Sequence, residues 1–572
     1  MSRRIARRRF LAGAGVLGIG LVAGLACRRG DQPPLTTLDA TISRDGGDLT
    51  YGAGESYAVR TDLAAAQTGR EGRRRSLLAF HHFSDFRIVD EESPLRSEWV
   101  DGCESLASTS AFRPQESLSL QAAAAMIAQA NRINASPVSG RRVDFVLHTG
   151  NAADNAQFNE LRWFIDVMDG KPVTPDSGVA GYLGVQTESP AAGYADLLTA
   201  AQARFLPEAL RYPWFAAAGN RDILAQGTFP PNDDAQALAT GTQKVLRVGP
   251  AAVQRGCADP AALLETQRGA LGEFDTVVQH VSADPGRRLL GRQQWVQEHF
   301  NTAQRPGPVG HGFSEENHAA GTAYYTQEFG PLVLIVLDST NSGGFSAGSI
   351  DATQFAWLEE QLKAHSRQYF DRDGRGMTSG AEDRLIVVAS HHPSAAMNNP
   401  FPDPVTQVER FRGPQLEELL HRFPNVVLHV AGHGLEHRLT PRPDPNLLRR
   451  HGEYWEVTTG SPLDFPMQGR LLEIVDNGDG TLSIFSTVYD TASPVDPTDA
   501  EDPTPNDGVN QLLLAGVARQ VGMRDPQLNE AASGLAASDR NAELLLAAPF
   551  GMDRATPAGA RRFGRRALLP VR

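Results

Sequence analysis

The sequence predicts an α/β layer fold, and three observations support that prediction. Short apolar runs have the length of buried strands, helical patterns lie between them, and each run carries a Gly, Asp, Asn or His at or near its end. Strands that alternate with helices are typical of sheets covered by helices. The runs are "LLAFHHFSDF", "VDFVLHTG", "PWFAAAGN", "PLVLIVLDST", "RLIVVASHHP" and "NVVLHVAGH".

The helical patterns place apolar residues three and four positions apart, in segments 119–133, 159–168 and 350–365. In sheets of this class, ligand-binding and catalytic residues lie on the loops beyond the carboxyl ends of the strands. The polar residues that follow the apolar runs fall on those loops. The sequence therefore predicts that they form the functional site.

Composition bounds the size of the core and the class of partner. The chain has 572 residues, of which 41% are hydrophobic, enough for one large globular domain with insertions or for two ordinary domains. The formal net charge is −13, and the arginine clusters lie at the two ends of the chain. This distribution argues against a nucleic-acid partner, while the acidic balance alone names no other partner.

Residues 1–27 have the pattern of an export signal. Arg7 and Arg8 precede Phe10, and a Gly- and Ala-rich apolar stretch follows that is short for a membrane span. We interpret this segment as a twin-arginine signal, which predicts an exported protein in the periplasm or anchored to the envelope. The alternative is a signal anchor that stays in the membrane.

The three cysteines raise two further questions. Cys27 closes the apolar run and resembles a lipoprotein acceptor, which makes it a candidate lipid anchor, although Gly24 stands where that pattern prefers a larger aliphatic residue. Cys103 and Cys257 could form a disulfide in an oxidising compartment. Two buried thiols are the alternative.

The rest of the chain divides by composition. Residues 28–75 form a weakly periodic, extended lead-in, and 76–490 form the main domain, with insertions near 171–200 and 226–280. Residues 491–572 begin as a Pro- and Asp-rich linker and continue as a helical extension that includes "DRNAELLLAAPF". The segments "DRDGRG" and "DNGDGT" lack the terminal Glu of a calcium loop and predict turns, the second within a hairpin.

Five strand-end residues carry the functional signal, and they occur in the order Asp85, Asn151, Asn220, His391 and His433. Their motifs, "SDFR", "TGNAADN", "AGNRD", "SHHP" and "AGHGL", resemble those of the calcineurin-like metallophosphoesterases. Three further stretches resemble one bacterial exported branch of that superfamily, namely "IVDEESPLR", "NELRWFIDVMDG" and "DFPMQGRLLEIVDNGDGT". The resemblance spans roughly residues 76–490. It implies a four-layer sandwich of two mixed sheets flanked by helices.

The resemblance also implies two metal ions, because members of this superfamily cleave phosphoesters with a bridged metal pair. The family's first metal site takes the Asp of D-x-H, which is Asp85 here. The His of that motif is replaced by Arg87, the bridging Asp by Asn151 and the last His of G-H-x-H by Leu435. The departures therefore fall on one side of the site.

The second metal site keeps Asn220, His391 and His433, with Asn151 as a weakened bridging ligand. We expect it to hold one divalent ion, Mn, Zn or Fe, or none. His392 is the alternative to His391, which the spacing to the following Pro favours.

The His that serves as acid in the family is Arg221, which cannot donate a proton near neutral pH. We assign Arg221, Asp222 and Arg87 to the former catalytic group and expect the two arginines to bind a small anionic or phosphate-bearing ligand. The alternative for Arg87 is a structural ion pair with Asp85, Asp90 or Asp222.

The sequence therefore favours a protein with a degenerate two-metal site that is weak or inactive in phosphoester hydrolysis. One alternative is an active phosphoesterase that uses one ion or substitute ligands such as His437 and Asp90. Another is an envelope interaction protein that uses its long C-terminal region.

Overall fold

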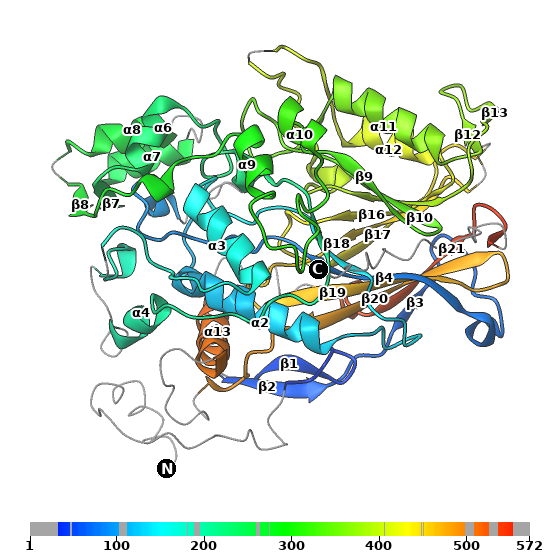
Figure 1. The fold of residues 1–572 in the computed structure, drawn as a ribbon, viewed down its shortest axis with the longest axis horizontal. Helices are drawn as coiled ribbons and strands as arrows, with labels where there is room; N and C mark the ends of the chain where they lie inside the picture. Colours follow the sequence, from blue (N-terminus) through cyan, green and yellow to red (C-terminus); the bar gives the residue numbers. More distant parts are fainter. Residues whose placement is uncertain are drawn as a thin grey trace, which may run out of the picture.

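Two mixed β-sheets pack face to face at the centre of the molecule (Figure 1). The computed structural model describes residues 33–45, 48–101, 111–179, 181–187, 195–258, 263–273, 275–404, 406–447, 449, 451–497, 508–525 and 536–552. The first sheet runs in the order β3 (Ala58–Arg60), β21 (Ala542–Ala547), β20 (Thr481–Asp490), β19 (Gln468–Asp476), β4 (Arg75–Phe83), β5 (Phe145–His148) and β6 (Trp214–Ala216). The second runs in the order β17 (Arg438–Arg442), β18 (Tyr454–Thr458), β16 (Val426–Ala431), β14 (Leu385–Ala389), β10 (Leu332–Val336) and β9 (Tyr325–Phe329).

Alternation along β10 shows how the layers are built. Leu332, Leu334 and Val336 belong to the core between the sheets, whereas Val333 and Ile335 belong to a second core under helices. Successive strand residues point to opposite faces, so this strand is apolar on both. Helices α11 (Ala352–Ala364) and α12 (Gly413–His421) cover the outer face of the second sheet, and α2 (Ser119–Arg132), α3 (Phe158–Asp169) and α13 (Gly508–Gly522) lie beside the first.

The predicted class, an α/β sandwich of two mixed sheets flanked by helices, is confirmed. All six apolar runs form strands, and the three helical patterns form α2, α3 and α11. "DNGDGT" joins β19 to β20 as the predicted hairpin, and "DRDGRG" lies between the paired strands β12 (Gln368–Phe370) and β13 (Gly376–Thr378).

Two segments differ from the expected outline. The lead-in contains a hairpin, β1 (Ala40–Asp45) with β2 (Asp48–Ala53), and it supplies β3 to the first sheet. The expected helix in "DRNAELLLAAPF" is wrong, because Ala542–Ala547 forms β21 between β20 and β3. Its apolar run is buried by strands on both sides, and periodicity alone cannot separate such a run from a helix.

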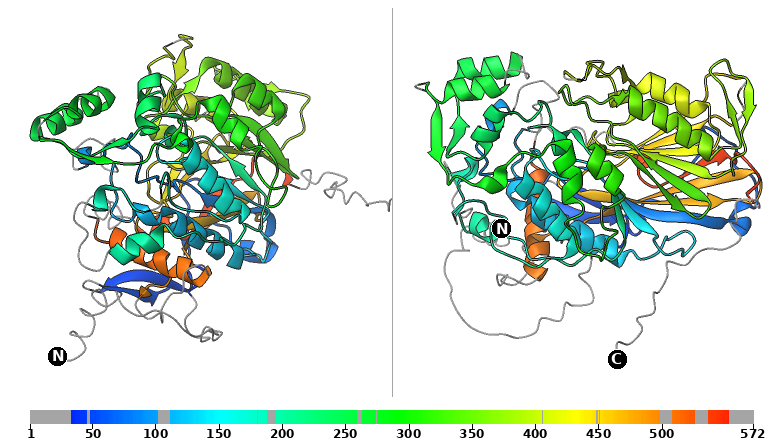
Figure 2. Two further views of the ribbon diagram at one scale, coloured as in Figure 1. Left: turned by 60° about the vertical axis from the view of Figure 1, so that its left-hand side comes forward. Right: turned by 45° about the horizontal axis from the view of Figure 1, so that its top comes forward.

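The insertion near 226–280 forms a lobe at one end of the molecule (Figures 1 and 2). It consists of α6 (Asp233–Ala239), β7 (Gln243–Arg247), α7 (Pro250–Ala258), α8 (Leu263–Ala270) and β8 (Val277–His280). The insertion near 171–200 contributes α4 (Ala195–Ala201). Cys257 in α7 is disulfide-bonded, so the free-thiol alternative is wrong for this residue.

Residues 1–32, which include Arg7, Arg8 and Cys27, lie outside the described residues, as do Cys103 and part of the Pro- and Asp-rich segment. Among the helices of the described ranges, none is both long and apolar enough to cross a bilayer.

Candidate metal centre

The predicted site residues follow the carboxyl ends of parallel strands in both sheets. Asp85 follows β4, Asn151 follows β5 and Asn220 follows β6, while His391 and His433 follow β14 and β16. The carboxyl ends of adjacent parallel strands share one edge of a sheet, so the two packed sheets bring these loops together. The fold therefore places all five residues at one location.

Several of these loop residues have strained backbones. The φ angles are 56° at Asp85, 47° at Arg87, 57° at Asn151, 67° at His433 and 57° at Leu435. Non-glycine residues rarely adopt positive φ, and such strain concentrates at functional sites. The tight turns of the site are thus present even at positions where the side-chain chemistry departs from the motifs.

Two glycines allow the loops to approach closely. At Gly150, which has a φ of 97°, a Cβ would lie 2.9 Å from Nδ1 of His391. At Gly432 a Cβ would lie 1.7 Å from Oγ of Ser84 and 2.8 Å from Oδ2 of Asp85. Any larger residue at either position would push the ligand loops apart.

Asn220 and His391 point acceptor atoms at one another. Nε2 of His391 lies 3.1 Å from Oδ1 of Asn220 and 3.3 Å from Nδ1 of His433. Nδ1 of His391 lies 2.7 Å from the carbonyl oxygen of Thr149, so Nδ1 carries the proton and donates it there. Burial holds the pKa of His391 well below its ordinary value, so the ring is neutral and Nε2 presents a lone pair.

The orientation of the Asn220 side-chain amide is also fixed, because its Nδ2 donates to the carbonyl oxygen of Gly227 at 2.9 Å. Oδ1 therefore faces the lone pair of His391, and neither atom has a proton to share. A cation between them removes this conflict, since ligand atoms of a tetrahedral zinc ion lie about 3.3–3.4 Å apart. Asn220, His391 and His433 fit one divalent ion.

His392 is engaged elsewhere. His391, His392 and His433 form a group of possible metal ligands with ligand atoms within 4.8 Å of one another. However, Nδ1 of His392 lies 2.8 Å from Oγ of Ser339, and its Nε2 lies 2.9 Å from the carbonyl oxygen of Ser346. With both nitrogens bonded to the loop at 339–349, His392 packs against His433 and supports it, with ring centroids 4.4 Å apart.

On the opposite side of the centre, Asn151 bonds to Asp85 directly. Nδ2 of Asn151 donates to Oδ1 of Asp85 at 2.8 Å, and Oδ1 of Asn151 accepts the backbone N–H of Arg221 at 2.8 Å. The other oxygen of Asp85 accepts from Oγ of Ser84 at 2.7 Å and from the backbone N–H of His433 at 2.9 Å. The NH₂ group of Asn151 thus occupies the side of Asp85 at which a cation would otherwise bind. The amide oxygen of Asn151 points to the backbone N–H of Arg221 instead of toward Asp85.

Arg87 and Arg221, the two arginines predicted to bind an anion, share one acid, Asp154. NH2 of Arg87 lies 2.9 Å from Oδ1 of Asp154, and NH1 of Arg221 lies 3.0 Å from the same oxygen. The alternative for Arg87, a structural ion pair, is therefore present, but its partner is Asp154 rather than Asp85, Asp90 or Asp222. The reason is the pairing of the loops after β4 and β5, in which the backbone N–H of Arg87 donates to the carbonyl oxygen of Asn151 at 2.8 Å and that of Asp154 donates to the carbonyl oxygen of Ile88 at 3.0 Å.

Arg96 and Arg113 complete this cluster. Arg96 lies 2.7 Å from Oδ2 of Asp154, and Arg113 lies 3.7 Å from its Oδ1. Burial alone would raise the pKa of Asp154, but Arg221, Arg96 and Arg113 hold it below its ordinary value. Neither arginine was predicted to join this cluster, because both lie outside the five strand-end motifs and the fold brings them to this acid.

We expect Asp154→Asn to destabilise the fold by about 3–5 kcal/mol, because it leaves several buried guanidinium groups around a neutral amide. Urea denaturation measures the change. The control is Asp373→Asn, whose pair with Arg375 has side chains 68% and 76% exposed and should cost about 0–1 kcal/mol. Equal losses for the two variants would show that Asp154 does not organise the arginines.

Asp222 lies beneath the loops and does not face the ion position. Its carboxylate accepts backbone N–H groups of Gly219 at 2.9 Å, Asn151 at 2.7 Å and Ala153 at 3.0 Å. Burial raises its pKa to about 7. Asp222 thus positions the loops that carry Asn151 and Asn220.

The proposed substitute ligands also lie elsewhere. Nδ1 of His437 accepts the backbone N–H of Gly460 at 3.3 Å. Asp90 is 3.2 Å from Nε of Arg287 and accepts from Asn159 at 2.6 Å. The structure therefore brings neither residue to the ligands of the ion.

One supporting relay was not predicted. Oγ of Ser390 lies 2.8 Å from Nε2 of His429, and Nδ1 of His429 lies 2.9 Å from Oε2 of Glu456. These buried residues link the adjacent strands β14, β16 and β18 directly before His391. The signal in the sequence was a polar residue within two of the apolar runs, Ser390 in "RLIVVASHHP" and His429 in "NVVLHVAGH".

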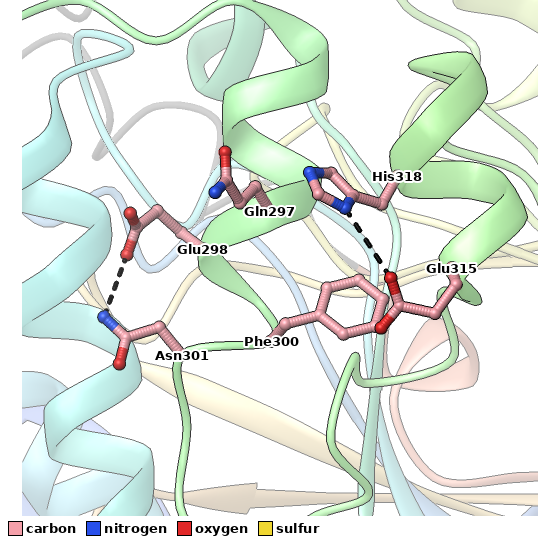
Figure 3. A pocket seen from close by; sticks show the side chains of 6 residues that line it. All are labelled: Gln297, Glu298, Phe300, Asn301, Glu315 and His318. Atoms are coloured by element: carbon pink, nitrogen blue, oxygen red, sulfur yellow. Dashed lines mark hydrogen bonds and ion pairs between the residues drawn. The ribbon is translucent and has the colours of Figure 1, made fainter.

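A surface hollow lies apart from the centre, between α9 (Arg292–Glu298) and α10 (Glu315–Ala320) (Figure 3). Its lining residues are Gln297, Glu298, Phe300, Asn301, Glu315 and His318. Glu298 accepts from Asn301 at 3.4 Å and His318 lies 3.7 Å from Glu315, so its polar groups pair with one another. None of the predicted site residues lines it.

No protein-family model and no curated protein matches the chain. Among solved structures, the chain is similar to a dimetal phosphatase from Danio rerio at 10% identity, covering 73% of this chain and 100% of that one with a TM-score of 0.27. It is also similar to a purple acid phosphatase from yellow lupin (Lupinus luteus) seeds at 11% identity, covering 81% of this chain and 58% of the lupin protein with a TM-score of 0.28. Identities this low transfer no residue roles, so the roles given above rest on the geometry of this chain.

Proposed function

We propose that this chain is an exported protein of the calcineurin-like metallophosphoesterase type that holds one divalent ion and binds a small phosphate-bearing anion with little or no hydrolysis. The observation that supports the proposal is the convergence of two acceptors, Nε2 of His391 and Oδ1 of Asn220, at 3.1 Å. Their orientations are fixed by Thr149 and Gly227, and a divalent cation bound between them would satisfy both acceptors. When bound, the ion would offer phosphate oxygens an electropositive ligand position.

The arginine cluster favours an anion at this position. Arg87 and Arg221 both contact Oδ1 of Asp154, which places two permanent positive charges beside the centre. The side chain of Arg221 is 10% exposed, against 2% for Arg87, so Arg221 is the one nearer to the solvent. We therefore assign the anion contact to Arg221 and a supporting role to Arg87.

We expect weak turnover because of the Asp85 and Asn151 side of the centre. Both oxygens of Asp85 are hydrogen-bonded by protein donors, and Asn151 offers its NH₂ group rather than an acceptor. Phosphoester hydrolysis in two-metal sites uses a second cation to activate water and share charge in the transition state. Arg221 also cannot protonate a leaving oxygen, because its guanidinium stays charged.

The direct test is metal-dependent binding of inorganic phosphate. Isothermal titration of protein loaded with Mn²⁺ or Zn²⁺ should show saturable binding, and protein stripped by a chelator should show none. Phosphate that binds the stripped protein equally well would contradict an ion at Asn220, His391 and His433.

We also propose export through the twin-arginine route to the periplasm or envelope, with Cys27 as a candidate lipid anchor. Replacing Arg7 and Arg8 together by lysine should leave the precursor in the cytoplasm, because the receptor recognises the arginine pair rather than charge alone. Cell fractionation measures the distribution. Unchanged export of the double-lysine variant would rule out the twin-arginine route.

A further inference from the structure

Two aromatic side chains stand half-exposed on loops beside the candidate metal centre. Phe345 is 44% exposed and Phe401 is 53% exposed. Their rings stack with centroids 5.2 Å apart and planes at 28°. Burial of an aromatic ring normally stabilises a fold, so two large rings left in water cost part of that free energy. Exposed apolar side chains that lie together are typical of binding sites.

The Phe345 loop contacts the histidine side of the centre. The carbonyl oxygen of Ser346, the next residue, lies 2.9 Å from Nε2 of His392. At Gly348 in the same loop, a Cβ would lie 2.5 Å from Cγ of His392. The His392 ring in turn packs on the ring of His433.

The same loop contacts the Asn220 side. The backbone N–H of Phe345 donates to the carbonyl oxygen of Thr228 at 2.5 Å. The preceding carbonyl, that of Gly227, accepts Nδ2 of Asn220 at 2.9 Å. Phe345 is therefore next to Ser346, which holds His392 against the ligand His433. It is also bonded to Thr228, whose neighbour Gly227 holds the ligand Asn220.

Buried asparagines hold both aromatic residues in place. Nδ2 of Asn341 donates to the carbonyl oxygen of Phe401 at 2.9 Å, and Nδ2 of Asn399 donates to that of Gly344 at 2.7 Å. The asparagines are only 1% and 3% exposed. Phe345 also has a φ of 69°, a conformation that a bulky residue adopts only when its surroundings impose it. The rings are thus presented to solvent by a rigid frame, which limits the entropy lost on binding.

We propose that Phe345 and Phe401 form a stacking platform for a planar aromatic group carried by the phosphate ester that binds the metal centre. The inference rests on the proposed function and narrows its ligand class to phosphate esters with an aromatic ring. A phenyl ring and a nucleobase share the flat π-face that this platform requires. Alkyl phosphates lack it.

Calorimetric titration of the metal-loaded protein tests the platform with two matched pairs of ligands. One pair is phenyl phosphate against methyl phosphate, and the other is adenosine 5′-monophosphate against ribose 5-phosphate. The aromatic member of at least one pair should bind about five- to 100-fold more tightly, and the pair that shows the gain identifies the ring as phenyl or nucleobase.

Three variants test whether Phe345 and Phe401 cause the preference for aromatic esters. Phe401→Ala and Phe401→Leu should both abolish the aromatic preference, since leucine keeps apolar area but has no ring face. Phe345→Asn should weaken the preference while keeping a residue that tolerates positive φ. The control is Tyr51→Ala, because Tyr51 in β2 is similarly exposed, at 41%, and lies on the separate β1–β2 hairpin.

The outcomes separate this inference from the proposed function. If inorganic phosphate and all four esters fail to bind the metal-loaded protein, the proposed function fails and the platform fails with it. If phosphate binds and neither aromatic ester gains affinity, the platform alone is wrong. A preference that survives in the Phe345→Asn, Phe401→Ala double variant also overturns it.

Discussion

His433→Ala should remove the bound ion, with a loss of affinity for Zn²⁺ or Mn²⁺ that exceeds about 100-fold. Residues that merely orient metal ligands typically contribute about 10- to 100-fold, and His433 is assigned as a ligand itself. Loss of its imidazole leaves Nε2 of His391 and Oδ1 of Asn220 as the remaining pair, 3.1 Å apart. Elemental analysis of the purified protein and calorimetric titration of the stripped protein measure the effect.

The matched control is His392→Ala, at a neighbouring histidine of the same possible ligand group. Both nitrogens of His392 bond to Ser339 and Ser346, so this variant should lose stability but keep its metal content at one ion per chain. Metal loss in His392→Ala with retention in His433→Ala would reverse the ligand assignment. Two ions per chain in the wild-type protein would contradict the single-ion centre.

The strand ends could be predicted from sequence because their chemistry is local. A buried apolar run followed by a glycine turn and a polar residue predicts both the strand and the edge at which its loop lies. Asn151, Asn220 and His433 follow their strands in this way, and the structure brings them together with His391. Spacing to the following proline favoured His391 over His392, and in the structure it is His391 that presents an unprotonated nitrogen to Asn220.

Partners that depend on long-range packing could not be predicted. The alternative for Arg87 was an ion pair with Asp85, Asp90 or Asp222, but Arg87 contacts Asp154, because the pairing of β4 with β5 brings their loops together. Arg96 and Arg113 join the same acid from loop segments outside the five strand-end motifs. The strand β21 was missed for a related reason, because its neighbours β20 and β3 lie far from it in sequence and supply the pairing that decides its conformation.

Restoring four motif residues together should recruit a second ion and raise phosphodiester turnover, and the structure explains why single reversions fail. Asn151→Asp alone would place a carboxylate where Nδ2 now donates to Oδ1 of Asp85 at 2.8 Å. Two carboxylates at that distance repel unless a cation lies between them. We expect this single variant to be less stable than the wild type and to regain stability when Mn²⁺ is added, which thermal denaturation would show.

The fourfold variant combines Arg87→His, Asn151→Asp, Arg221→His and Leu435→His. Histidine is among the residues that tolerate positive φ, so it suits positions 87 and 435, where φ is 47° and 57°. Asp154 loses two guanidinium partners but keeps Arg96 and Arg113, so the buried acid stays paired.

One transition-state electrostatic contribution is typically worth about 100- to 1,000-fold in rate, and this variant regains a second cation together with an acid that can protonate the leaving oxygen. We therefore expect turnover of an aryl phosphodiester to rise by at least about 100-fold over the wild type when Mn²⁺, Zn²⁺ or Fe²⁺ is supplied. His433→Ala in the fourfold background should abolish the gain, because the ion held by the existing ligands is then lost. Wild-type turnover equal to that of the fourfold variant, and lost in His433→Ala, would show that the single-ion centre is already a working hydrolase.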